Sequence, residues 1–161
     1  MNTRLPFAVL ALFLALAAPL AAQEGVGDFG LRLGQAYDPS IVLSSETDNF
    51  HFQYFLVNPP RISERYQHYV IYVTPFSKVI YTLSAWGRFR SPYDCLEEGA
   101  RVTQELSAKH GRAVEDDLAG GGPARFAVGT QVIVIECTGV ANFTDLRISY
   151  TDSVLEAEAK R

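Results

Sequence analysis

The residue types in this chain that could carry chemistry are two cysteines, three histidines and two short acidic clusters. Adjacent side chains on a helix point in different directions, so Glu97 and Glu98 cannot flank one scissile bond. The acidic run at residues 115–117 lacks the alternating oxygen ligands of a calcium-binding loop. The chain also lacks a nucleophile elbow, a zincin helix motif and a phosphate-binding loop. The sequence therefore predicts neither an enzyme active site nor a bound metal or cofactor.

The three histidines are predicted to lie apart from one another. His51 alternates with the apolar residues of a predicted strand, and His110 lies in the last turn of a predicted helix, where the helix dipole favours a basic residue. The strand pairing that we expect places His51 near Val73 rather than beside His68. A shared metal site is therefore not expected.

The first 22 residues have the composition of a secretory signal peptide. Arg4 supplies a positive charge, residues 7–18 form an apolar run, and small residues precede a predicted cleavage after Ala22. A membrane anchor is the alternative, because residues 5–22 carry no charge. Two prolines bracket the apolar run and no basic segment follows it, which favours cleavage. We therefore expect residues 23–161 to form a single α+β domain, periplasmic or secreted.

Export changes the interpretation of the two cysteines, Cys95 and Cys137. In the cytosol we would expect two buried thiols, whereas in an oxidising compartment two cysteines usually pair. Cys95 lies on the apolar stripe of a predicted helix, and Cys137 shares a strand face with Ile133 and Ile135. A helix packed on that strand face would bring the sulfurs together. The sequence therefore predicts a Cys95–Cys137 disulfide.

The helix that carries Cys95 is the clearest element of the sequence. Ser91 is the predicted N-cap, Pro92 the first helical residue and Gly111 the residue that ends the helix. Its apolar stripe repeats at helical spacing, at Cys95, Gly99, Val102 and Leu106. The spacing and the caps predict a helix over residues 92–110.

The remaining elements are predicted from period-two alternation and from turn residues. Strands are expected at residues 29–34, 50–56, 68–74, 79–86, 130–138 and 146–150. Between them we expect a brief helix at 38–43, a polar turn at 44–49, a flexible acidic connection at 112–124, and a short helix or frayed tail at 153–161. Hairpins lie on both sides of the long helix. The predicted fold class is therefore α+β, with an antiparallel sheet of about five or six strands, one long helix packed on one face and one disulfide.

The hairpin of residues 68–74 and 79–86 is apolar or aromatic on both faces. If Thr74 faces Val79 across the turn, Tyr72 faces Tyr81, and Val70 likewise faces Leu83. In that register the residues of the opposite face are Tyr69, Ile71, Val73, Ile80 and Trp86. One face can form the core, whereas the other needs a covering element, a partner or a ligand.

Because no catalytic or metal-binding motif is found in the sequence, the function must be inferred from the charge and the aromatic residues of the predicted surface. The net charge is −4, with 14 basic against 18 acidic residues, so the chain has no basic surplus for nucleic acid. Tyrosine and tryptophan combine large contact area with a polar group and are enriched at protein interfaces. The candidate binding residues are Tyr54, Tyr72 and Tyr81, which are expected on one aromatic sheet face, and Trp86, which is expected on the other.

Three functions are compatible with these features. The first is a non-enzymatic protein-binding module of a bacterial envelope or secreted type, such as an inhibitor, an immunity-type protein or an envelope accessory factor, which uses an aromatic sheet face. The second is a structural homo-oligomer that buries this face against a copy of itself. The third is a small ligand-binding protein or enzyme with a pocket between sheet and helix, lined by His51 or His68. We expect the first.

Overall fold

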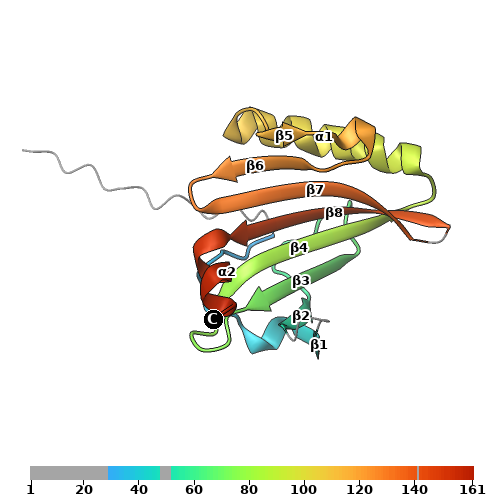
Figure 1. The fold of residues 1–161 in the computed structure, drawn as a ribbon. Helices are drawn as coiled ribbons and strands as arrows, with labels where there is room; N and C mark the ends of the chain where they lie inside the picture. The colour runs from blue at the N-terminus through green and yellow to red at the C-terminus, as the bar shows by residue number, and fades with distance from the viewer. Residues whose placement is uncertain (1–28, 48–51, 141) are drawn as a thin grey trace, which may run out of the picture.

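The computed structural model describes residues 29–47, 52–140 and 142–161; the predicted signal peptide at residues 1–22 lies outside these ranges. Within them the chain forms one antiparallel sheet of eight strands with two α-helices (Figure 1). The strands are β1 (Val42–Thr47), β2 (Gln53–Val57), β3 (His68–Val73), β4 (Ile80–Phe89), β5 (Glu115–Asp116), β6 (Ala124–Val128), β7 (Gln131–Val140) and β8 (Phe143–Asp152). The α-helices are α1 (Pro92–His110) and α2 (Ser153–Ala159).

The sheet has the strand order β1-β2-β3-β4-β8-β7-β6-β5. This confirms the predicted antiparallel sheet, α+β class and disulfide, but the expectation of five or six strands and one helix was too low. β4 and β8 lie at the centre, so segments far apart in sequence pair over most of their length, as Thr82 does with Thr151, 69 residues away. The centre of the sheet is therefore assembled by contacts that local sequence patterns do not report.

Three strands lie outside the predicted strand ranges. β1 takes the last two residues of the brief helix predicted at 38–43 and residues 44–47 of the predicted turn, β5 lies within the acidic connection predicted at 112–124, and β6 begins at the last residue of that connection. β1 is exposed along almost its whole length, so it lacks the apolar alternation that marks a half-buried strand. Its pairing with β2, rather than burial of its own side chains, makes it a strand.

The predicted strand at residues 29–34 is not formed. Gly30 and Gly34 have φ angles of 75° and 81°, in the left-handed region, which interrupts an extended strand. Phe29 and Leu31 are nevertheless buried, at 4% and 3% exposure. The alternation therefore predicted the burial of Phe29 and Leu31 correctly, but the segment packs on the core as a loop and not as a strand.

The predicted helix is confirmed as α1. The Ser91 hydroxyl accepts a hydrogen bond from the backbone N–H of Asp94 at 3.1 Å, and Gly111 ends the helix with a φ of 85°. All four residues of the predicted stripe are buried: Cys95, Gly99, Val102 and Leu106. The stripe packs on β4, β6, β7 and β8.

The predicted disulfide is also confirmed, and it joins α1 to β7. The Cys95 and Cys137 sulfur atoms are bonded and their Cα atoms lie 6.1 Å apart. Cys95 is fully buried. Cys137 shares its strand face with Ile133 and Ile135, which are also fully buried, so this face of the sheet is the core face.

Two structures cover the core face together. α1 covers the β6–β8 side, and the segment at residues 29–41 covers the side formed by β2 to β4. Phe29 makes edge contacts with the rings of Tyr66, Tyr69 and Tyr150, and Tyr37 stacks on Phe55 at 5.0 Å between ring centroids. The opposite face is not covered by either structure.

α2 follows β8 without a connecting loop, which resolves the prediction for residues 153–161 as a helix. The Asp152 carboxylate caps it by accepting hydrogen bonds from the backbone N–H groups of Val154 and Leu155, at 3.0 and 3.1 Å. The helix contacts β4 and β8 near one end of the sheet (Figure 1). It therefore lies at the edge of the sheet face opposite α1.

Candidate functional site

We call the sheet surface opposite α1 the open face. Directly paired residues of an antiparallel sheet point to the same side, so the register assigns its side chains to crosswise rows. One row runs Glu46, Tyr54, Tyr72, Thr82, Thr151 and Val132. A second runs Leu56, Val70, Ser84, Ser149 and Val134, and a third His68, Trp86, Arg147 and Glu136.

The four predicted contact residues all belong to the open face. The ring centroids of Tyr54 and Tyr72 are 5.5 Å apart, and those of Tyr72 and Tyr81 are 5.9 Å apart. Trp86 lies one row away, with its ring 5.5 Å from that of His68. Tyr81 is only 5% exposed, so Tyr54, Tyr72 and Trp86 present the aromatic surface.

The position of Trp86 corrects the predicted register of the hairpin. Thr74 does bond across the turn to Val79, and Val73 pairs with Ile80 as expected. A bulge then shifts the pairing by one residue, so that Tyr72 lies opposite Thr82 instead of Tyr81.

Because of this shift, Leu83 and Trp86 each lie on the face of the sheet opposite to the predicted one. Leu83 enters the core opposite Ile71, and Trp86 joins Tyr72 on the open face instead of lying with Ile71. The bulge therefore brings the single tryptophan of the chain onto the same surface as the tyrosines.

The open face holds two adjoining hollows. The first, which we call the α2 hollow, has a volume of about 480 Å³ and is lined by Phe52, Tyr72, Tyr81, Thr82, Arg147, Ser149, Thr151, Glu156 and Lys160. The second, which we call the Trp86 hollow, has a volume of about 360 Å³ and is lined by Tyr54, Val70, Tyr72, Trp86, Thr138, Asp145 and Arg147. Tyr72 and Arg147 line both. The two hollows therefore form one continuous concave surface.

Small hydroxyl side chains form the floor of this surface. Ser84 and Ser149 are hydrogen-bonded at 2.8 Å between their Oγ atoms, and Thr82 and Thr151 at 3.0 Å. Both pairs join β4 to β8, the two central strands. Because these side chains are short and the tyrosines, tryptophan and arginine around them are long, the centre of the face is recessed.

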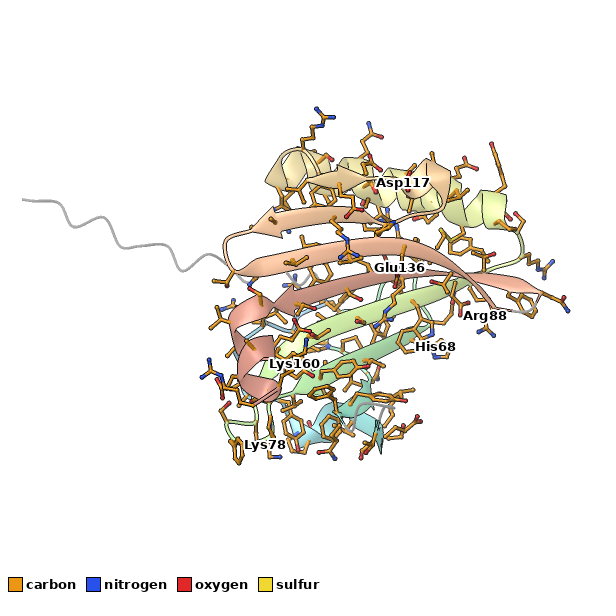
Figure 2. The ribbon with its side chains drawn as sticks, viewed as in Figure 1. His68, Lys78, Arg88, Asp117, Glu136 and Lys160 are labelled. Carbon is orange, nitrogen blue, oxygen red and sulfur yellow. A yellow bond between two sulfur atoms is a disulfide. The ribbon has the colours of Figure 1, made fainter. Side chains whose placement is uncertain are left out.

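Charged side chains frame the hollows, and most are paired within the protein. Arg88 donates two hydrogen bonds to Asp145, at 2.9 and 3.2 Å, and Lys160 donates one to Glu156 at 2.7 Å. The hydrogen bond from Arg88 to Asp145 raises the pKa of the guanidinium. Arg147 lies 3.9 Å from Glu136 and makes a looser pair. His68, Arg88, Glu136 and Lys160 can be followed in Figure 2.

Arg147 was not among the predicted site residues, although the sequence contains a signal for it. In β8 it alternates with Leu146 and Ile148, both of which are buried in the core. The period of two therefore places Arg147 on the face opposite the core. The hydroxyl floor could not be identified in this way, because it depends on which strands pair.

A separate cavity of about 260 Å³ lies between α1 and the sheet. Its lining, as far as the described residues show, includes no histidine; His68 lies on the open face and His51 lies outside the described residues. It is bordered instead by Tyr66, Arg65 and Glu105. The histidine-lined pocket of the ligand-binding alternative is therefore not found in the described part of the chain.

Ion pairs at the mouth of this cavity hold the loop before β3 onto α1. Arg65 donates two hydrogen bonds of 2.7 Å to Glu105 and lies 3.0 Å from Glu98. The bonds to Glu105 raise the pKa of Arg65, and the same bonds lower the pKa of Glu105. Burial raises the pKa of the neighbouring Tyr66 phenol. These interactions are structural, since each charge has an internal partner.

The Arg65–Glu105 pair predicts a pH-dependent contribution to stability. Because the pKa of Glu105 in the folded protein is below its usual value of 4.5, the contribution is present at neutral pH and is lost as pH falls below that value. Glu105→Gln is expected to lower the unfolding free energy by about 0.5 kcal/mol at pH 7, a small effect because solvent screens an exposed pair. The difference from wild type should shrink below pH 4.

Urea unfolding of both proteins at pH 7 and pH 3 measures this difference. Glu97→Gln, an exposed glutamate of the same helix, is the matched control and should change stability equally at both pH values. A Glu105→Gln deficit that persists unchanged at pH 3 would show that packing, and not the ion pair, causes it.

Comparison with known proteins adds no relative to these observations. No protein-family model matches the chain, and no match was found among curated proteins or solved structures. In the described ranges there is also no helix long and apolar enough to cross a membrane, and no group of three or more histidine, cysteine or acidic side chains placed to hold a metal ion.

Proposed function

We propose that this chain is an exported, non-enzymatic protein-binding module that binds its partner with the open face. The observation that carries the proposal is the convergence of Tyr54, Tyr72, Trp86 and Arg147 around two adjoining hollows on a sheet surface that neither helix covers. Tyrosine, tryptophan and arginine are the residues that most often dominate the binding energy of protein interfaces.

The geometry of the open face supports binding more than catalysis. Its acidic residues Asp145 and Glu156 are held by basic neighbours, and its hydroxyl groups are paired with one another across β4 and β8. A hydroxyl nucleophile would need an adjacent base to take its proton. The open face instead offers a firm, recessed surface with aromatic walls, which suits a protruding segment of another protein.

A periplasmic or secreted location is part of the proposal. The predicted signal peptide at residues 1–22 supports export, and the buried disulfide between Cys95 and Cys137 is of the kind that persists in oxidising compartments. If residues 1–22 are removed, mass spectrometry of protein purified from cells that express the whole sequence will give the mass expected for residues 23–161.

The binding role is tested by partner capture with matched surface variants. The full sequence is expressed with a C-terminal tag, and captured proteins are compared for wild type, a Tyr72→Ala/Trp86→Ala double variant and a Phe76→Ala/Tyr93→Ala control. Phe76 and Tyr93 are 85% and 73% exposed and lie in the β3–β4 turn and on α1, away from both hollows. We expect a stoichiometric partner with wild type and the control, and its loss with the first variant.

Light scattering of the purified protein separates this function from the homo-oligomer. A monomeric mass that does not change with concentration agrees with a module that binds a different protein rather than a second copy of itself. A dimer that the Tyr72→Ala/Trp86→Ala change dissociates would show that the open face binds a second copy, and the proposed function would then be wrong.

A further inference from the structure

Arg147 occupies the middle of the open face and is the one charged residue that lines both hollows. It lies on central strand β8, paired with Trp86 of β4 on one side and Glu136 of β7 on the other. Its side chain is 43% exposed, so the guanidinium is accessible from the concave side. Arg147 is therefore in the position where a group of a docked partner would approach.

The hydrogen-bond donors of Arg147 are poorly used within the protein. Its Nε atom is buried and has no acceptor among the described residues, and its Nη1 atom lies 3.9 Å from the Glu136 carboxylate, beyond hydrogen-bond distance. Two neighbouring basic side chains differ: Lys160, which lines the α2 hollow, donates to Glu156, and Arg88, which lies outside both hollows, donates to Asp145. The buried Nε atom cannot reach a partner, so the two Nη groups of this partly exposed Arg147 side chain are the donors available to an external acceptor.

Resting on the proposed function, we infer that Arg147 binds a carboxylate of the protein partner, while an apolar or aromatic side chain beside that carboxylate enters the Trp86 hollow. A guanidinium matches a carboxylate in a planar, two-bond geometry that few other groups offer. The walls of the hollow supply Tyr54, Val70, Tyr72 and Trp86 for the apolar part.

The charges around Arg147 favour a carboxylate over a phosphate group. Asp145 and Glu156 are already paired with Arg88 and Lys160, whereas Glu136 has only the 3.9 Å contact with Arg147, so its negative charge would repel a doubly charged anion more strongly than a singly charged one. A singly charged carboxylate replaces the weak contact that Glu136 makes at 3.9 Å. Glu136 is therefore a weak internal competitor for the same Arg147 donors.

The inference is tested with small probes, because Trp86 is the only tryptophan of the chain and lines the hollow in question. Its fluorescence is followed during titration with N-acetyl-L-phenylalanine, which has a carboxylate beside an aromatic side chain, and with N-acetyl-L-phenylalaninamide, which lacks the charge. We expect the carboxylate to bind at least about tenfold more tightly than the amide. Sodium sulfate at matched ionic strength should not displace it.

Variants assign the preference to Arg147. Arg147→Gln should remove the difference between the two probes, and Arg147→Lys should keep only part of it, since an ammonium group lacks the fork. Arg125→Gln, on the open face but outside both hollows and paired with Glu115, is the control and should bind as wild type does. Glu136→Gln should tighten binding of the carboxylate about threefold by removing the competitor.

The gain expected for Glu136→Gln keeps the inference falsifiable even if Arg147→Gln fails to fold. Equal binding of both probes, equal displacement by sulfate, or no response of Trp86 to the carboxylate would each overturn the inference.

Partner capture with Arg147→Gln separates failure of this inference from failure of the proposed function. Capture that survives Arg147→Gln but not Tyr72→Ala/Trp86→Ala leaves the binding module in place and rejects the carboxylate contact. Capture that survives both variants rejects the open face as the binding surface, and with it both proposals.

Discussion

Replacing both cysteines with alanine is expected to lower the free energy of unfolding by about 4 kcal/mol, because the disulfide closes a loop of 42 residues. The cross-link limits the unfolded chain, and in the folded protein it fixes α1 to β7, where Cys95 is fully buried. The double variant Cys95→Ala/Cys137→Ala should therefore melt about 10 °C or more below wild type. Circular dichroism during heating and urea unfolding measure both quantities.

Reduction provides the control for this variant. The described residues contain no free cysteine, so a thiol reductant acts on this one bond. Wild type unfolded in the presence of reductant should approach the stability of Cys95→Ala/Cys137→Ala, and the variant itself should not respond to reductant. If reduced wild type remains as stable as the oxidised protein, the loop-closure argument is incorrect for this fold.

Gly87→Ala is expected to destabilise the protein by about 3 kcal/mol, the largest effect of any single methyl group that we anticipate. A Cβ atom at Gly87 would lie 2.0 Å from the backbone carbonyl oxygen of Arg65, which is not a flexible side-chain end. The loop lies this close because Gln67 donates its backbone N–H to the Trp86 carbonyl and accepts at its side chain from Arg88. The methyl group must push the loop away from β4.

Displacement of that loop has a second, measurable consequence. Arg65 is held on α1 by Glu105 and Glu98, so a displaced loop should lose these ion pairs as well. In Gly87→Ala the added effect of Glu105→Gln should then be close to zero, which a double-mutant cycle detects.

Gly139→Ala is the matched control for Gly87→Ala. Gly139 is also a strand residue, and a Cβ there would have nothing within 4 Å. This variant should be neutral or slightly more stable than wild type, since alanine loses less backbone entropy on folding than glycine. Equal behaviour of the two glycine variants in urea unfolding would contradict the steric argument.

The open face shows which side-chain positions the alternation pattern predicts correctly and which it does not. Alternation assigned Tyr54 and Tyr72 to one surface, and the structure places them there with rings 5.5 Å apart. The same alternation placed Trp86 on the other side, because a period of two is kept only while no residue is inserted. One bulge in the β3–β4 hairpin was enough to change the assignment.

Strand pairing also determined which hydroxyl side chains form the floor of the candidate site and which basic residue, Arg147, lies at its centre. Ser84 meets Ser149, and Arg147 meets Trp86, only because β4 pairs with β8 across α1 and three intervening strands of sequence. Nothing local in either segment specifies the other as its neighbour. A pattern can state that a strand has two different faces, but the neighbour is chosen by the whole sheet.

The sequence by itself determined the features that rest on interactions within one short segment. Ser91, Pro92 and Gly111 mark the ends of α1, and its stripe, together with the apolar face around Cys137, predicted the disulfide. Only the tertiary structure decided that residues 29–41 cover part of the core face, that polar β1 is a strand, and that Arg147 lies beside the aromatic residues. Caps and periodicity act over a few residues, whereas register and coverage are set by contacts between distant segments, which no local pattern encodes.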